Sequence, residues 1–137
     1  MTNAQWPMKA APYNLDERTA LYGEVVIEFC QGLPLTPITS PLITQFVKAA
    51  TSVGANYGEA DEAESKPDFR HKIALCRKES REAKHWCRML AKAVPGEKSA
   101  IRPLWREARE LHLIFCKIIR TTDENLRLAR VAKSANR

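Results

Sequence analysis

The positions of proline limit where this chain of 137 residues can form helices. A proline inside a helix removes a backbone hydrogen bond and clashes with the preceding turn, so a long helix needs a stretch without proline. The eight prolines leave four such stretches, over residues 13–33, 42–66, 68–94 and 104–137. The sequence therefore predicts four helices, and the period of the apolar residues in each stretch tests that prediction.

Apolar residues recur at helical spacing, and most regularly in the last two stretches. In the stretch 68–94 they follow spacings of four and three, at Phe69, Ile73, Cys76, Ser80, Ala83, Cys87 and Leu90. The next stretch repeats the pattern at Leu104, Ala108, Leu111, Phe115 and Ile118. Such a repeat is the seam of packed helices, and short connections favour antiparallel neighbours. We expect an all-α fold, an antiparallel up-down four-helix bundle over residues 13–122, with an N-terminal extension over 1–12 and a basic tail over 123–137.

Capping residues mark some of the expected helix ends. Ser40 followed by Pro41 suits an N-cap with proline in the first helical turn. Ser65 and Asp68 have the spacing of a capping box, and Gly32 suits a C-cap. These positions predict that the second helix begins at Ser40 and the third at Ser65.

A strip of small residues follows one face of the second stretch. Ala50, Gly54 and Gly58 lie four residues apart. Each glycine inside a helix costs about 1 kcal/mol relative to alanine, so close packing of another helix is the expected compensation.

The last stretch carries more apolar surface than one bundle core needs. A second apolar row, formed by Trp105, His112, Cys116 and Ile119, lies beside the seam. One row can face the bundle core, and the other can face a second subunit. The alternative is a small bundle with broad apolar faces. The pattern favours a homo-oligomer.

Charge is distributed unevenly along the chain. Residues 1–65 hold three basic and eight acidic residues, a net charge of −5, whereas residues 66–137 hold nineteen basic and eight acidic, a net charge of +11. A strongly basic half suggests a surface that attracts polyanions such as nucleic acid. The alternative, that lysine and arginine only solvate helix exteriors, stays open at this point.

The basic residues form stripes at helical spacing. The candidate contacts to RNA or DNA are Arg70, Arg77, Arg81, Lys84, Arg88, Arg102, Arg106, Arg109, Arg127 and Arg130. Contacts of this kind are made to the phosphate backbone of the nucleic acid, and they discriminate weakly between base sequences. The tail that carries the last two is either a helical extension or a segment that orders on binding.

Residue patterns for enzyme or metal chemistry are not evident. Four cysteines show no CxxC spacing, no cysteine–histidine pair has zinc-finger spacing, and three scattered histidines form no HExxH. We expect the cysteines, at Cys30, Cys76, Cys87 and Cys116, to be small core residues. We therefore expect no catalytic residues, no metal and no cofactor.

Membrane and secretory signals are also not evident. No stretch approaches the ~18 uncharged apolar residues that a membrane span needs. The first residues lack a basic start followed by a long apolar run. The expected location is cytoplasmic.

Several motifs in the chain occur together in one bacterial family. The first is QFVKAATSVGANYGEA over residues 45–60, followed by Ser65, Asp68 and Phe69. The others are Lys72-Ile73, Lys78-Glu79, Glu82 and Trp86, then Glu107-Ala108, Glu110-Leu111, Ile114-Phe115, Ile118-Ile119 and Thr121. Over about residues 13–122 the chain resembles the four-helix bundle family of 23S rRNA-intervening sequence proteins. It departs from the family at Cys87, where leucine is usual.

The resemblance implies structure more than activity. Members of the family form ring-shaped homopentamers of four-helix bundles, and no enzymatic activity is attached to them. The family is also similar to the accessory proteins of diversity-generating retroelements, which partner a reverse transcriptase and bind nucleic acid. The polar positions of its motif correspond to Asn56, Glu59, Lys72, Lys78 and Glu79. They form either a buried structural network between the second and third helices or a binding pair at Asn56 and Glu59.

Two hypotheses for function follow. The first is a non-enzymatic homopentamer that binds RNA or DNA through basic helix faces. The second is a protein-binding adaptor for a nucleic-acid-processing enzyme such as a reverse transcriptase. An enzyme is a third and weaker reading.

Overall fold

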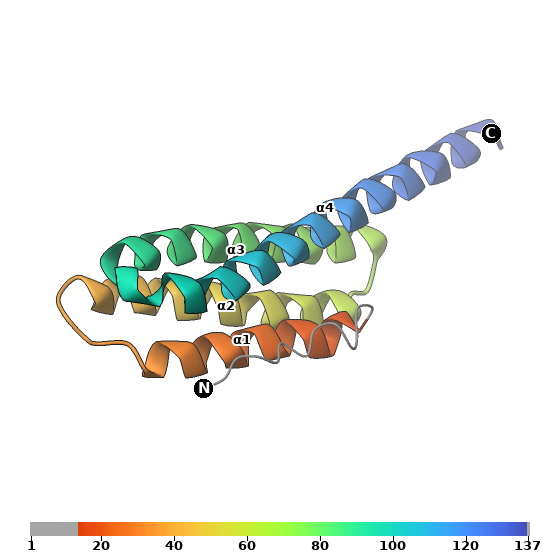
Figure 1. The fold of residues 1–137 in the computed structure, drawn as a ribbon. Coiled ribbons are helices and arrows are strands. Elements are labelled where there is room, and N and C mark those ends of the chain that lie inside the picture. The colour runs from red at the N-terminus through yellow and green to blue at the C-terminus, as the bar shows by residue number, and fades with distance from the viewer. Residues whose placement is uncertain (1–13, 137) are drawn as a thin grey trace.

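The computed structural model describes residues 14–136 and consists of helices. They are α1 (Leu15–Gln31), α2 (Thr39–Asp61), α3 (Lys66–Ala93) and α4 (Lys98–Ala135), with a short 3-10 turn, η2 (Pro95–Glu97), before α4. Each helix packs mainly on the next in sequence, and consecutive helices run in opposite directions (Figure 1). The prediction of an all-α, up-down arrangement of four helices is confirmed for this part of the chain.

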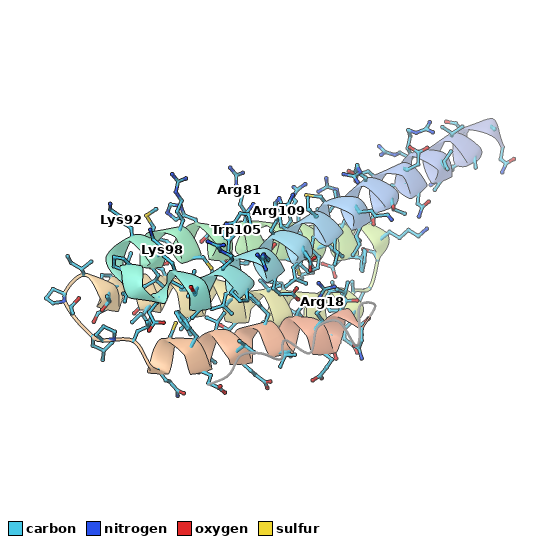
Figure 2. The ribbon with its side chains drawn as sticks, in the orientation of Figure 1. Arg18, Arg81, Lys92, Lys98, Trp105 and Arg109 are labelled. Carbon is cyan, nitrogen blue, oxygen red and sulfur yellow. The ribbon has the colours of Figure 1, made fainter. Side chains whose placement is uncertain are left out.

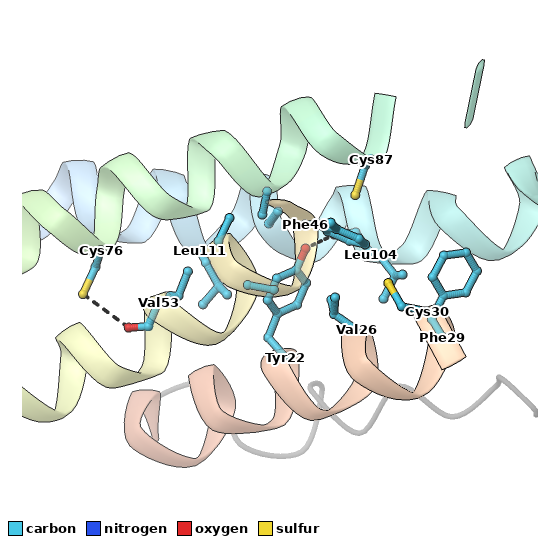
Figure 3. Close-up of a cluster of buried hydrophobic side chains, with 14 of the residues drawn as sticks. Tyr22, Val26, Phe29, Cys30, Phe46, Val53, Cys76, Cys87, Leu104 and Leu111 are labelled. Carbon is cyan, nitrogen blue, oxygen red and sulfur yellow. Dashed lines mark hydrogen bonds between the residues drawn. The ribbon is translucent and has the colours of Figure 1, made fainter. Parts of the chain in front are cut away.

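The core follows the predicted seams, with one shift. In α3, every expected seam residue is buried except Phe69, which is half-buried. In α4, the seam is buried from Leu104 to Phe115, but the next buried residue is Ile119, and Ile118 is half-buried. Figure 3 shows four of the seam residues, Cys76, Cys87, Leu104 and Leu111, near Tyr22 of α1. The buried Tyr22 hydroxyl donates a hydrogen bond of 3.0 Å to the Leu104 carbonyl.

The helix caps agree with the sequence at two of three positions. The Ser65 hydroxyl accepts a hydrogen bond from the Asp68 amide, and Gly32 is the C-cap of α1. The predicted cap at Ser40 is wrong, because α2 already begins at Thr39. There, Thr36 and Thr39 each accept the other's backbone N–H through their hydroxyls. This reciprocal pair has the hydrogen-bond pattern of a capping box but lies in the turn just before α2, whose N-cap is Ile38.

Helix α4 begins earlier than the proline-free stretch suggests and ends later than the bundle. Pro103 lies inside it, near its N-terminus. Pro103 has no backbone N–H, so the carbonyl of Ser99, four residues earlier, lacks its helical hydrogen-bond donor. Ser99 is exposed, so this carbonyl faces water. At the other end, Thr122 is the last buried residue. Residues 123–135, which we call the α4 extension, project past the other helices (Figure 1).

Helices α1 and α2 approach closely at two glycines. A Cβ atom on Gly54 of α2 would lie 3.3 Å from the backbone of Thr19 and Ala20 in α1. A Cβ atom on Gly23 of α1 would lie 3.3 Å from the Thr51 Cα atom. The expected close packing is thus confirmed at Gly54. It is absent at Gly58, where a Cβ atom would meet nothing within 4 Å.

Helices α1 and α4 are joined by a buried ion pair. The Arg18 guanidinium donates two hydrogen bonds, of 2.7 and 2.9 Å, to the Glu107 carboxylate and one of 3.1 Å to Glu110. Arg18 is 7% exposed and Glu107 is 2% exposed. Burial raises the pKa of the Glu107 carboxyl, and the hydrogen bonds from Arg18 oppose that rise. The pair therefore fixes the contact between the first and the last helix.

Candidate nucleic-acid interface

Basic side chains gather on the side of α3 and α4 that faces away from α1 and α2. Figure 2 shows Arg81, Arg109 and Trp105 on that side, whereas Arg18 lies on the opposite side of α4. Spacings of four and three residues keep each set on one helix face, and the two helices pack side by side. We define the basic face as Arg77, Arg81, Lys84 and Arg88 of α3 and Arg102, Arg106 and Arg109 of α4.

The side chains of the basic face form no ion pair with a carboxylate of the described residues, although the charge of Arg77 contributes to lowering the pKa of the Asp123 carboxyl. Within residues 14–136, no ion pair involves any of its seven members. The carboxylates of Glu107 and Glu110 on α4 instead point to Arg18, on the other side of the helix. Positive charge on this face is therefore not held in direct ion pairs among residues 14–136, and it is available to a polyanion.

The three other predicted contact residues differ from this set. Arg70 binds the Asp123 carboxylate with hydrogen bonds of 2.7 and 3.1 Å. These bonds hold the pKa of the Asp123 carboxyl below its usual value. Arg127 binds Glu124 at 2.6 Å, so both arginines have carboxylate partners within the protein. Arg130 has none among the described residues, and its Nε donates to the Leu126 carbonyl at 3.5 Å.

A groove opens where the basic face crosses from α3 to α4. It encloses about 440 Å³. Its apolar walls are Cys87 and Ala91 of α3 and Ile101 and Trp105 of α4. Four cations line it as well, and they are Arg88, Lys98, Arg102 and Arg106. None of its lining residues is acidic, so the groove combines apolar and aromatic contact area with uncompensated positive charge.

Sequence reasoning placed two of these lining residues differently. Trp105, which we expected in an apolar row that faces a second subunit, lines the groove and is 37% exposed. Lys98 precedes the stretch in which a helix was expected. The signal that would have found it is the four-residue spacing of Lys98, Arg102 and Arg106, which continues the basic stripe back through Pro103.

The polar residues of the family-like motif do not form a single buried network. Lys72 donates to the Glu59 carboxylate at 2.6 Å and joins α3 to α2, but the Glu59 side chain is largely exposed. Asn56 donates to the Ser52 carbonyl of its own helix. Lys78 is exposed, and Glu79 is half-buried, which raises the pKa of its carboxyl. Among these five residues, the Lys72–Glu59 pair is the side-chain contact that joins α3 to α2 within the described part of the chain.

The cysteines and His112 occupy structural positions. Cys30, Cys76 and Cys87 are buried, which raises the pKa of their thiols to about 11, 12 and 12, and Cys116 is half-buried. The His112 Nδ1 atom lies 3.1 Å from the Arg77 carbonyl. Within residues 14–136, no group of histidine, cysteine and acidic side chains could hold a metal ion. None of the helices there combines the length and apolar character needed to cross a membrane.

Comparisons with known proteins agree with the fold. The solved structure of a protein of unknown function from the S23 ribosomal protein family of Bacteroides thetaiotaomicron VPI-5482 superposes with a TM-score of 0.67. The two chains are 20% identical, and the match covers 77% of this chain and 97% of the other. No curated protein matches the chain.

The family itself follows from the sequence match. The model of the 23S rRNA-intervening sequence protein family matches residues 22–117, which includes the motif in α2, all of α3 and most of the bundle part of α4. This range also contains the whole basic face. The chain therefore belongs to the family of 23S rRNA-intervening sequence proteins.

Proposed function

We propose that this protein is a non-enzymatic, cytoplasmic nucleic-acid-binding bundle that holds RNA or DNA by its phosphates along the basic face. One observation carries the proposal: seven basic side chains at helical spacing share one face of α3 and α4, and none of them forms an ion pair with a carboxylate of residues 14–136. Cations with internal partners bind phosphate at the expense of those pairs. Unpaired cations bind it without that loss and release counterions from the nucleic acid.

The salt dependence of binding tests this role. We expect labelled RNA or DNA to bind with an affinity that falls steeply as the salt concentration rises. The slope of the logarithm of the binding constant against the logarithm of the salt concentration is expected to be about −0.7 per phosphate contact on single strands and about −0.9 on duplex DNA. Fluorescence anisotropy at two or more salt concentrations measures the slope. No binding at low salt would refute the proposal.

Charge reversal on the basic face provides the sharper test. The variant Arg81→Glu/Arg109→Glu is expected to lower affinity by about tenfold or more and to reduce the salt slope by about 2, because two phosphate contacts are lost. The matched control is Lys48→Glu/Lys66→Glu, which changes net charge equally at exposed positions outside the face. An equal loss in both variants would show that net charge, rather than this face, drives binding.

We further propose that the bundle assembles as a ring-shaped homo-oligomer, a pentamer. Exposed apolar side chains along the outside of α4, among them Leu113, Leu128 and Val131, support an apolar contact between subunits. A ring would repeat the basic face around one axis and raise the affinity through effective concentration. Native mass spectrometry is expected to give a mass about five times that of one chain, and a monomer would contradict the assembly.

A protein-binding adaptor role is the second candidate. Leu128 and Val131 on the α4 extension are 50% and 55% exposed, on a helix that projects beyond the bundle. A partner such as a reverse transcriptase could cover them. If binding to nucleic acid is absent while the extension is required for capture of such an enzyme, the adaptor role is favoured.

A further inference from the structure

We infer that the groove between α3 and α4 takes an unpaired nucleobase of a single strand, stacked against Trp105, with the flanking phosphates on the arginines at the groove's rim. This inference rests on the proposed nucleic-acid binding and adds a substrate class to it: single-stranded rather than duplex nucleic acid. It identifies Trp105 as the residue that distinguishes the two.

The interior of the groove suits a flat aromatic ligand. Its volume of about 440 Å³ lies within the range of about 300–1,000 Å³ that small-molecule sites occupy. Ala91 and the indole of Trp105 provide the accessible apolar surface, and Cys87 and Ile101, which are 1% and 3% exposed, line the groove from the core. Because every nucleobase has a π-face, stacking of this kind tolerates any base.

Trp105 is held in place from outside the groove. The Lys84 Nζ atom lies 5.6 Å from the centroid of the Trp105 ring, in the range of a cation–π interaction. Lys84 is not among the described residues that line the groove, so this cation contacts the ring from outside the groove. An aromatic ring fixed in this way loses little further rotamer freedom when a base stacks on it.

The charge around the groove suits a phosphodiester chain. Arg88 of α3 and Arg102 and Arg106 of α4 line it from both helices and are exposed. No lining carboxylate would repel a phosphate. Bases in a duplex are paired and stacked, so their faces cannot reach Trp105, whereas bases in a single strand can be splayed out and stacked on aromatic side chains. The basic face alone would bind both forms, and the groove adds affinity for the single strand only.

The experiment compares a labelled, unstructured RNA strand about 12 nucleotides long with the duplex of the same sequence, by anisotropy at one salt concentration. The wild type is expected to prefer the single strand. Trp105→Leu keeps an apolar wall but removes stacking, and it is expected to weaken single-strand binding by roughly 5- to 100-fold while leaving duplex binding unchanged. Trp105→Phe, which retains an aromatic ring, is expected to keep most of the preference.

A second measurement uses the unaltered protein and so does not depend on the folding of a variant. A single strand that carries photoreactive 4-thiouridine is expected to crosslink to Trp105, located by mass spectrometry of the peptides. Equal affinity for both forms, an unchanged preference in Trp105→Leu, or crosslinks only elsewhere would overturn the inference and leave phosphate binding intact. A change in native mass in Trp105→Leu would show that a second copy of the chain occupies the groove. Absence of binding to either form would instead refute the proposed function itself.

Discussion

Replacing Glu107 with alanine is expected to lower the free energy of unfolding by about 3–5 kcal/mol. Arg18 would then remain buried without its most buried carboxylate partner, and the Glu110 carboxylate that it also binds is largely exposed. A buried charge that loses its main partner retains the cost of desolvation but not the compensating attraction. Urea unfolding of the wild type and the variant measures the difference.

Two further variants separate the ion pair from general effects of mutation. Glu124→Ala removes an exposed pair with Arg127 and is expected to change stability little, because solvent screens that pair. The double replacement Arg18→Met/Glu107→Leu fills the same space with apolar side chains and is expected to recover most of the loss. If Glu107→Ala cost no more than Glu124→Ala, the buried pair would not hold α1 to α4.

The second large effect is expected at the crossing of α1 and α2. Gly54→Val should destabilise the protein by about 1–3 kcal/mol or more, because its side chain would enter space occupied by backbone. The nearest atoms belong to the main chain of Thr19 and Ala20, at 3.3 Å from the Cβ position, and a helix backbone cannot rotate away as a side chain can. Thermal or urea unfolding measures the change.

Gly58 provides the matched control in the same helix. Its Cβ position is open, so Gly58→Val makes the same chemical change without a clash. Its expected effect is within about 0.5 kcal/mol in either direction. Similar losses at both positions would show that helix α2 is sensitive to valine in general rather than to contact with α1.

The helices and their seams could be predicted because burial on a helix leaves a periodic trace. In α3 the buried residues keep a strict alternation of three and four from Ile73 to Leu90. In α4 the interval from Phe115 to Ile119 is a second successive step of four. A straight helix needs such a step, since its period is 3.6 rather than 3.5 residues. A heptad template extended through this point therefore predicted Ile118 in place of Ile119.

Neither the ion pair nor the groove could be predicted from the sequence. In a sequence pattern, a charged residue at a core position cannot be distinguished from a charged residue at the surface. Arg18 lies four residues before Tyr22, and Glu107 lies three after Leu104, so both have core register. Their burial depends on the contact between them, and the two residues are 89 positions apart in the chain. The basic stripes were visible as spacing, but which cations lack partners depends on tertiary contacts, such as Arg70 with Asp123.

The helix of the α4 extension continues from a helix that the bundle has already formed. A free segment of its length is too short to hold a helix in water, because forming the first turn fixes several residues for one hydrogen bond. Here the bundle supplies that first turn, and each later residue joins an existing template. We therefore expect helical order to be graded, greatest near Thr122 and least near Ala135, because every residue from 127 to 136 is exposed. A molecule that covers Leu128 and Val131 meets a helix whose nucleation is already complete, and it has only fraying to suppress.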